Sequence, residues 1–356
     1  MPGLKLALLG AGNVAESYVR QVRRLREDGM DVELAAICGR IAEGANRLAS
    51  RFGIAAHGAD YDALLSRADI DGVIVLTPMQ LHHAHAKSAL LAGKHVLVEK
   101  TLAGTVDEAE ELLALAEARG LCLAAAPFTT LSPTFQAARR RIAAGEIGEI
   151  RSARALYGWA GPDWAGWFHQ QGAGPLRDLG IYGLTTLTGL LGPVRSVHAL
   201  ANGGNAAAPD NFQLSLELAN GCLGTVATGY TLQKFKTPGI EIYGARGTLQ
   251  FIGQDWAPEG LELWTNESGC WRSFAAPFAW PWTDGVRDFC QSILSRQPLA
   301  SHPTHAVHVL DIVNQAMASA QSGRSEAVRT GFVRPTVQPE ALAAGDHRRH
   351  NPLNIT

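Results

Sequence analysis

Several features that would mark a specialised class of protein are scarce in this chain of 356 residues. Its five cysteines are widely spaced and form no CxxC pair, which argues against a disulfide framework and a zinc knuckle. No basic block is present, and 31 basic residues stand against 33 acidic ones, so nothing suggests a nucleic-acid or anionic-membrane partner. No apolar run reaches transmembrane length and no signal-peptide pattern opens the chain, so we expect a cytoplasmic protein.

The composition is otherwise that of an ordinary globular protein, with 46% hydrophobic and 18% charged residues, and the length suggests two domains. In the first part, short apolar runs alternate with helical patterns. The runs lie at residues 4–9, 32–38, 72–77, 95–99 and 121–126. This alternation predicts an α/β Rossmann domain over residues 1–126, with a parallel sheet covered on both faces.

After residue 126 the pattern becomes that of half-buried strands. Between residues 211 and 230, apolar residues recur at every second position, and Asn220-Gly221 provides a tight hairpin turn. Residues 127–356 are therefore expected to form an α+β domain with an open, mainly antiparallel sheet, the domain to which the family resemblance described below assigns substrate binding and oligomerisation. The Pro-, Arg- and His-rich residues 330–356 lack periodicity and are expected to be a tail, either an arm or partly disordered.

The first strand ends in the turn GAGNVA, which matches the pattern G-x-G-x-x-A between a strand and a helix. Gly10 permits the tight turn, Gly12 lets a pyrophosphate approach the backbone, and Ala15 allows close helix packing. Asn13 and Val14 complete the turn, and the phosphate would lie at the helix N-terminus. We therefore predict a dinucleotide site.

The end of the second strand lacks the acidic residue that usually binds the ribose of NAD. Gly39 takes its place and Arg40 follows. A guanidinium can bind a 2′-phosphate, which an acid would repel, so NADP is favoured over NAD. Arg40 could equally stack on an adenine or be a solvated loop residue.

Residues 175–191 are predicted to form one helix, starting at Pro175 and ending before Gly192-Pro193. Its leucines share one stripe, and Asp178 and Tyr182 lie almost opposite it. Two interpretations are open. The acid and phenol could lie on a solvated face, with Asp178 near the helix dipole, or they could face a site.

Aromatic residues precede this helix: Trp159, Trp164, Trp167 and Phe168. Core packing would explain each of them, but flat rings also suit the apolar faces of sugars, and Trp167 is the expected cleft residue. Two groups of histidines also stand out, at residues 82–85 and 302–308. No carboxylate or cysteine completes a ligand set in either group, so we predict no metal site.

Taken in order, the glycine turn, Thr77-Pro78, Glu99-Lys100-Thr101 and DLGIY at 178–182 resemble the Gfo/Idh/MocA oxidoreductase family. The similarity extends over roughly residues 4 to 325. The resemblance implies a Rossmann domain joined to an α+β domain, and oxidation or reduction of a secondary alcohol on a sugar, cyclitol or similar polyol with NAD(P). It also implies a cofactor site that includes Thr77, Pro78, His82, Glu99 and Lys100.

The resemblance places Lys100, Asp178 and Tyr182 around the substrate. Tyrosine has an ordinary pKa near 10 and is a poor base unless a cation stabilises its phenolate. We therefore expect Tyr182 to be the acid/base, Lys100 its electrostatic partner and substrate clamp, and Asp178 the residue that orients the lysine or accepts from a substrate hydroxyl. Lys100 as the base, with Tyr182 only a donor, remains open.

Three positions depart from the family pattern. Thr101 replaces the proline after the lysine, Met79 replaces the asparagine of T-P-N, and Tyr182 stands where many members have histidine, as in the glucose–fructose oxidoreductase and dihydrodiol dehydrogenase branch. Two other activities stay open, a redox-neutral NAD-dependent glycosidase and a non-catalytic cofactor-binding regulator. Because the open sheet often packs against a second subunit in this family, we expect a homodimer or homotetramer.

Overall fold

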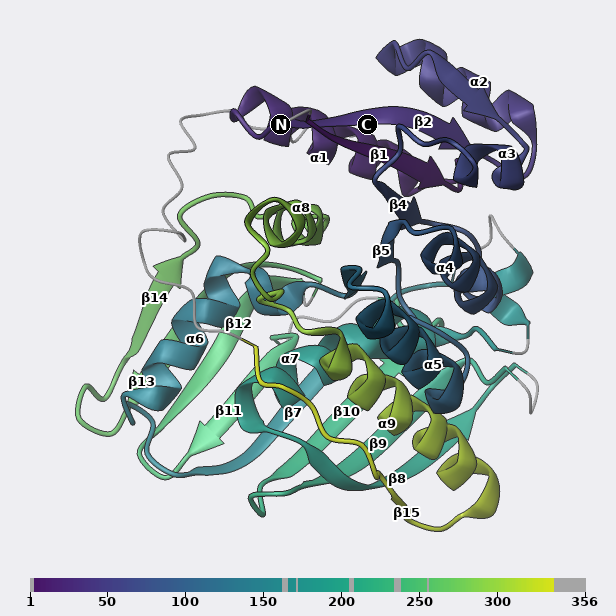
Figure 1. The fold of residues 1–356 in the computed structure, drawn as a ribbon. Coiled ribbons are helices and arrows are strands. Elements are labelled where there is room, and N and C mark those ends of the chain that lie inside the picture. The colour runs from purple at the N-terminus through teal and green to yellow at the C-terminus, as the bar shows by residue number, and fades with distance from the viewer. Residues whose placement is uncertain are drawn as a thin grey trace.

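A computed structural model shows a small parallel sheet and a large mixed sheet, with helices between and around them (Figure 1). The described residues are 3–161, 166–170, 172–204, 208–233, 238–254 and 256–335. Among them, no helix combines the length and the apolar character needed to cross a membrane.

The first sheet is the predicted Rossmann sheet. Its strands are β1 (Leu4–Leu9), β2 (Val32–Cys38), β3 (Ala56–Gly58), β4 (Gly72–Val75), β5 (His95–Val98) and β6 (Leu123–Ala125). They are all parallel, in the order β3-β2-β1-β4-β5-β6. The order reverses beside β1, and ligands of such sheets bind at the carboxyl ends of the strands around that point. The short strand β3 was not among the five predicted runs.

Helices cover both faces of this sheet. They are α1 (Ala15–Glu27), α2 (Ala42–Phe52), α3 (Tyr61–Leu65), α4 (His82–Leu91) and α5 (Val106–Ala118), with a 3-10 turn η1 (Met79–Leu81). A later helix, α8 (Gly285–Ser295), returns to the same sheet, and its Phe289 and Cys290 are fully buried in the core beneath α1. A boundary after residue 126 remains our proposal for the domain division, with α8 crossing it.

The second sheet has nine strands in the order β14-β13-β12-β11-β7-β10-β9-β8-β15. They are β7 (Ile150–Gly158), β8 (Val194–Asn202), β9 (Asn211–Leu218), β10 (Leu223–Gly229), β11 (Ile240–Gly244), β12 (Gly247–Gln254), β13 (Ala257–Thr265), β14 (Trp271–Ala275) and β15 (Glu326–Ala327). All neighbours are antiparallel except β7 and β10. The predicted hairpin is confirmed, with Gly221 at φ +82° in its turn.

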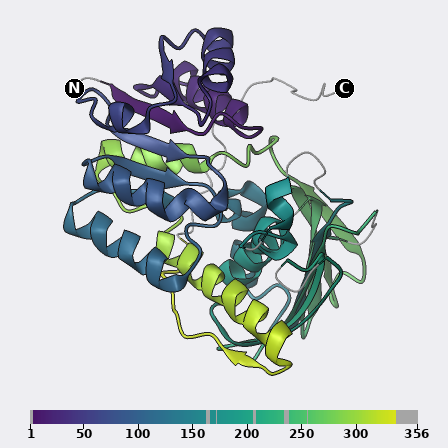
Figure 2. The same ribbon diagram turned by 90° about the vertical axis from the view of Figure 1, so that its right-hand side faces the viewer.

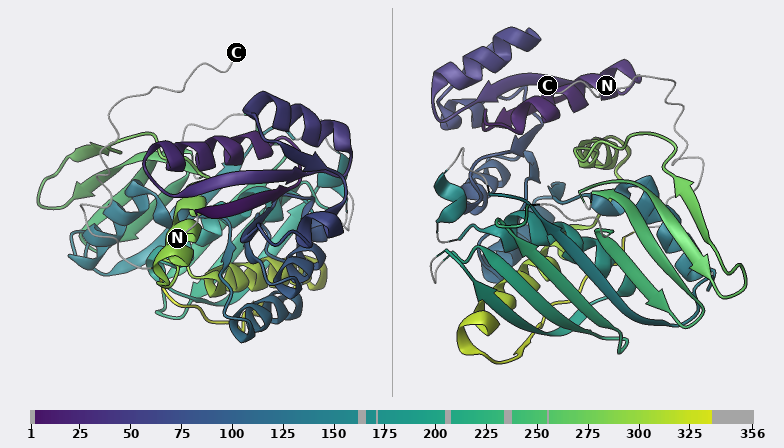
Figure 3. Two further views of the ribbon diagram at one scale, coloured as in Figure 1. Left: turned by 45° about the horizontal axis from the view of Figure 1, so that its top comes forward. Right: turned by 180° about the vertical axis from the view of Figure 1, so that it is seen from behind.

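One face of the large sheet packs on helices and the other is open (Figure 2). The covering elements are the π-helical turn η4 (Leu176–Gly180) and the helices α6 (Pro133–Ala143), α7 (Ile181–Leu191) and α9 (Pro303–Ser322). The 3-10 turn η2 (Thr129–Leu131) packs on α6 and α7, and a second 3-10 turn, η3 (Gly166–His169), precedes η4 in the chain. Seen from behind, the described strands face the viewer with no helix across them (Figure 3, right). Along β9, buried and exposed residues alternate as the sequence predicts.

The chain is helical over 175–191, as predicted, but the helix is not regular throughout. Residues 176–180 form the π-helical turn η4, and the α-helix α7 begins at Ile181. Every residue of α7 except Tyr182 is buried, because the helix is enclosed by the sheet and neighbouring helices instead of exposing a polar face. Gly183 permits this close packing, since a Cβ there would lie 2.7 Å from Cβ of Ala155.

The expected tail starts as an ordered segment. Backbone N–H groups of Arg329 and Thr330 both donate to Oδ2 of the buried Asp311 on α9, at 2.9 and 3.1 Å. The segment up to residue 335 thus follows α9, and residues 336–356 lie outside the described part of the chain.

Candidate active site

A cleft of about 1020 Å3 lies between the two sheets. The first domain contributes Glu99 and Lys100, which directly follow β5, and the second contributes Asp178 from η4 and Tyr182 from α7. The three residues predicted to act on substrate therefore line one cavity although 78 positions separate Lys100 from Asp178.

The ammonium group of Lys100 is bound by Asp178. Lys100 Nζ donates to the main-chain oxygen of Asp178 at 2.8 Å and forms a short ion pair with its Oδ1. Burial lowers the pKa of Lys100, but the charges of Asp178, Tyr182 and Glu99 raise it more, so its pKa lies above the ordinary value. The acidic neighbours of Lys100 thus favour its charged form in the cleft.

Asp178 is also held from the other side, by a residue that the sequence did not indicate. The hydroxyl of Tyr230 donates to Asp178 Oδ2 at 3.1 Å, and both residues are buried. Burial and the negative charge of Asp178 raise the pKa of Tyr230, which keeps it a neutral donor. Both carboxylate oxygens of Asp178 are thus engaged, which fixes the carboxylate toward Lys100.

Tyr182 lies beside this pair. The Lys100 Nζ atom is 5.1 Å from the centroid of the Tyr182 ring, within cation–π distance. Tyr182 is partly exposed in the cleft, unlike its neighbours in α7. The interpretation of Asp178 and Tyr182 as a solvated helix face does not hold, since Asp178 is only 7% exposed.

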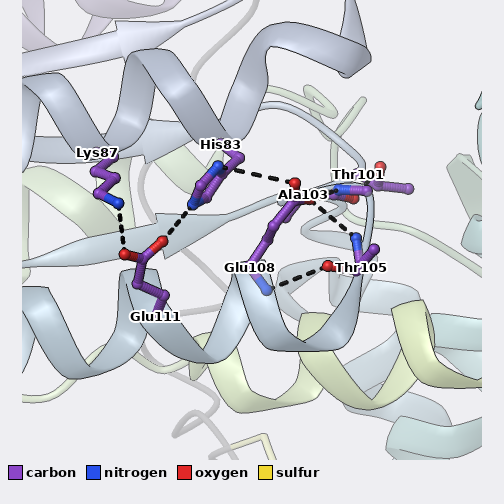
Figure 4. Close-up of polar contacts among 8 residues, drawn as sticks. His83, Lys87, Thr101, Ala103, Thr105, Glu108 and Glu111 are labelled. Atoms are coloured by element: carbon purple, nitrogen blue, oxygen red, sulfur yellow. Dashed lines mark hydrogen bonds and ion pairs between the residues drawn. The ribbon is translucent and has the colours of Figure 1, made fainter.

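The loop after Lys100 is anchored by α5 (Figure 4). Thr105 and Glu108 form a capping box, and Glu108 Oε2 also accepts from the backbone N–H of Gly104 at 2.9 Å. From α4, His83 reaches Glu111 at 2.7 Å (Figure 4). The Lys100-Thr101 peptide bond is cis. Thr101, which stands where the family has proline, donates from its hydroxyl to the Ala103 oxygen at 2.9 Å within this loop.

The glycine turn fits a dinucleotide. Gly10 has φ +112°, and a Cβ there would lie 2.6 Å from the Leu76 oxygen, so only glycine suits the turn. A Cβ added to Gly12 would have no other heavy atom within 4 Å, so there is room for a pyrophosphate beside this residue. No side chain of the described residues caps α1, so the positive end of the helix dipole can face an anion at this turn. Asn13 and Val14 are exposed at this turn.

The other predicted cofactor residues surround the same edge of the sheet. Thr77 directly follows Leu76, whose carbonyl lies close to Gly10. The next residue, Pro78, is exposed. His82 is only 1% exposed, and its two ring nitrogens each lie 2.7 Å from a main-chain oxygen, of Thr77 and of Thr101. His82 thus joins the two loops behind the site. Met79, at the asparagine position of the family, is buried.

At the end of β2, Gly39 is buried and Arg40 is exposed. A Cβ at Gly39 would lie 3.2 Å from Cβ of Ala11, so a longer acidic side chain would crowd the glycine turn. Arg40 is the charged residue that directly follows this position.

Of the aromatic cluster, Trp159 and Phe168 line the cleft. Trp164 and the side chain of Trp167, the residue expected in the cleft, lie outside the described part of the structure. Trp282 also lines the cleft, and the sequence did not indicate it, because it comes from a loop more than a hundred residues after Lys100. Among the described residues, no group of three His, Cys, Asp or Glu could hold a metal ion.

Comparisons with known proteins identify the family of both parts of the chain. Residues 4–126 match the model of the oxidoreductase family with an NAD-binding Rossmann fold, and residues 135–250 match the GFO/IDH/MocA C-terminal domain. The chain is 35% identical over 202 residues to D-glucoside 3-dehydrogenase of Escherichia coli K12, covering 55% of this chain and 57% of that protein. The chain thus spans little more than half the length of that relative.

Two further proteins are similar to this chain over a larger share of its length. Trans-1,2-dihydrobenzene-1,2-diol dehydrogenase of Bos taurus is 26% identical over 266 residues, which is 72% of this chain and 77% of that protein. The crystal structure of GenD2 from gentamicin A biosynthesis, in complex with NAD, superposes with a TM-score of 0.78 at 26% identity, covering 93% of this chain and 97% of that one.

Proposed function

Because the chain belongs to the Gfo/Idh/MocA oxidoreductase family, we propose that it is an NAD(P)-dependent dehydrogenase or reductase. Its substrate would be a secondary alcohol, or the matching ketone, of a sugar, cyclitol or related polyol. The observation that carries this proposal is the Lys100–Asp178 ion pair, which lies beside Tyr182 in the cleft. Val14 of the glycine turn lines the same cleft. The names of the relatives, dehydrogenases of a D-glucoside and of a diol, support the substrate class.

The bound cofactor would supply the acceptor or donor of hydride. Tyr182 would take the proton of the substrate hydroxyl as hydride leaves the same carbon. An ammonium group has three donors, and Lys100 gives two of them to Asp178. The third can bind the substrate oxygen, and its positive charge stabilises the phenolate that forms when Tyr182 loses its proton.

We propose NADP as the preferred cofactor. Gly39 leaves no carboxylate at the ribose position, and the exposed Arg40 can form a forked contact with a 2′-phosphate. The turn from Gly10 to Ala15, together with Thr77 and Pro78, would bind the rest of the dinucleotide, with Glu99 at its nicotinamide end.

We also propose that the protein forms a homodimer or homotetramer through the open face of the large sheet. Three large apolar side chains stand on this face although water would surround them in a monomer, namely Leu200, Leu223 and Trp271, which are 64%, 60% and 48% exposed. Burial of such side chains against a second copy would be favourable.

A screen of free sugars, cyclitols and glycosides with NADP or NAD tests the activity. We expect reduced nicotinamide to accumulate with at least one of them, and Lys100→Ala to abolish this signal. Cleavage of a glycoside without accumulation of reduced cofactor would instead identify the redox-neutral glycosidase. Tight cofactor and sugar binding with no turnover would identify the regulator.

A further inference from the structure

Tyr18 is a fully buried tyrosine in the first turn of α1. Its ring packs edge-on against Trp282, with centroids 5.5 Å apart and an interplanar angle of 85°. Phenylalanine would fill this space equally well. The hydroxyl therefore needs a separate explanation, because a buried polar group is costly without a partner.

The partner of Tyr18 is Glu99. The Tyr18 hydroxyl donates to Glu99 Oε1 at 2.5 Å, and the backbone N–H of Lys100 donates to Glu99 Oε2 at 2.9 Å. Both oxygens of this carboxylate, which is only 7% exposed, are therefore occupied. Burial and the charge of Glu99 raise the pKa of Tyr18 well above its ordinary value, so Tyr18 remains a donor.

This arrangement determines which carboxylate pairs with Lys100. Glu99 is the neighbour of Lys100 in the chain, and its charge acts on the Lys100 ammonium. Nevertheless, the ion pair of Lys100 is with Asp178, 78 positions away. A carboxylate with no other donors would be drawn to the nearest buried cation, since attraction rises steeply in a site of low dielectric constant.

We propose that Tyr18 is a positioning residue that holds the Glu99 carboxylate away from the Lys100 ammonium, so that the ammonium serves Asp178 and the substrate. The expected effect on kcat rests on the proposed function, whereas the expected position of the Glu99 carboxylate does not. Because α1 carries both Tyr18 and the end of the glycine turn, the same helix aligns the cofactor turn and the lysine.

The variant Tyr18→Phe tests the proposal, because it removes the hydroxyl and keeps the ring. At saturating cofactor we expect kcat to fall roughly ten- to a hundredfold, as a small displacement of a reacting group does. KM for the substrate should change by less than about threefold, since contacts made equally in the ground state are retained. Glu99→Gln removes the carboxylate that would compete for Lys100, so adding Tyr18→Phe to Glu99→Gln should change kcat by less than about twofold.

The matched control is Tyr61→Phe. Tyr61 lies in the same domain, and its hydroxyl also donates one protein hydrogen bond, to the His85 oxygen at 2.7 Å. We expect this variant to lose stability without changing kcat by more than about twofold. An equal effect of the two substitutions on kcat would make Tyr18 a merely structural residue and overturn the proposal.

A crystal structure of Tyr18→Phe provides a measurement that needs no substrate. The Glu99 carboxylate should turn toward Lys100 Nζ. An unmoved Glu99 contradicts the positioning role even if kcat falls. If the wild-type protein oxidises no alcohol, the proposed function fails, whereas the position of Glu99 in this structure still decides the role of Tyr18.

Discussion

Lys100 and Asp178 are bonded twice across the cleft, once through the side-chain carboxylate and once through the main-chain oxygen of Asp178. The second bond is made to the backbone of η4. The position of the Lys100 ammonium therefore depends on the position of that turn as well as on the charge of Asp178. Lys100 follows β5 of the first sheet and Asp178 lies in η4 on the second, so this pair connects the two parts of the chain that line the cleft.

The first prediction concerns the cofactor. NADP should bind more tightly than NAD, and Arg40→Asp should reverse this order by removing a charge-assisted contact worth roughly 1.5–3 kcal/mol, about ten- to a hundredfold in Kd. Fluorescence titration of both cofactors measures the ratio. Arg23→Asp, an exposed arginine on α1, is the control for net charge and should leave the ratio unchanged. Tighter NAD binding by the wild type would contradict the assignment.

The second prediction concerns assembly. Light scattering at micromolar concentration should show a dimer or tetramer. Leu223→Asp on the open face of the sheet should produce monomers, because it places a charge in the proposed interface. Leu294→Asp on α8 is the control, since Leu294 is 46% exposed but lies away from this sheet. A wild-type monomer, or equal effects of both substitutions, would exclude the interface.

Local patterns predicted the elements whose signals lie within a few residues. The alternation of Phe212, Leu214, Leu216 and Leu218 and the turn at Asn220-Gly221 were sufficient for β9 and β10. The site was predictable only where a family motif carried it, as for Lys100, Asp178 and Tyr182, whose roles stay proposals.

Contacts between distant segments had no local signal. The Tyr230–Asp178 hydrogen bond joins residues 52 positions apart, and the Tyr18–Glu99 bond joins residues 81 positions apart. The π-helical turn η4 was missed for a related reason. The stripe of leucines that includes Leu176 and Leu179 is equally compatible with a regular helix and with a π-helical turn.

The third prediction concerns acid stability. His305 and His308 on α9 are buried against Phe332, and burial lowers the pKa of His305 to about 3 and that of His308 to about 4. In the unfolded chain a histidine takes up its proton near pH 6.5. The unfolded state therefore binds more protons below that pH, so stability is full above pH 6.5 and is lost as the pH falls toward 4.

Urea unfolding between pH 7 and pH 4 measures this loss (~1.4 kcal/mol per pH unit for each histidine). In His305→Gln, the fall in unfolding free energy per pH unit should be smaller by about the contribution of one histidine. The amide can still bond the Thr188 hydroxyl but does not titrate. His57→Gln is the control, since His57 is exposed to water in the folded protein too. An unchanged slope in His305→Gln would show that His305 is not kept neutral by the fold.

The last prediction concerns proton transfer. Tyr182→Phe deletes one hydroxyl and keeps the ring beside Lys100, so folding and cofactor binding should be nearly intact. Turnover should nevertheless fall by a factor on the order of 10² to 10⁴, the usual contribution of a positioned acid or base. Lys100→Ala should lose at least as much, because it removes both the substrate donor and the cation that stabilises a phenolate.

The double variant Tyr182→Phe/Lys100→Ala should then be little worse than either single variant, since residues that act as one unit are not additive. Tyr61→Phe again serves as the control for loss of one phenol. Turnover of Tyr182→Phe at the wild-type rate would remove Tyr182 from the reaction and leave Lys100 as the base. Strict additivity in the double variant would show that the phenol and the ammonium act on separate steps, although they lie side by side in the cleft.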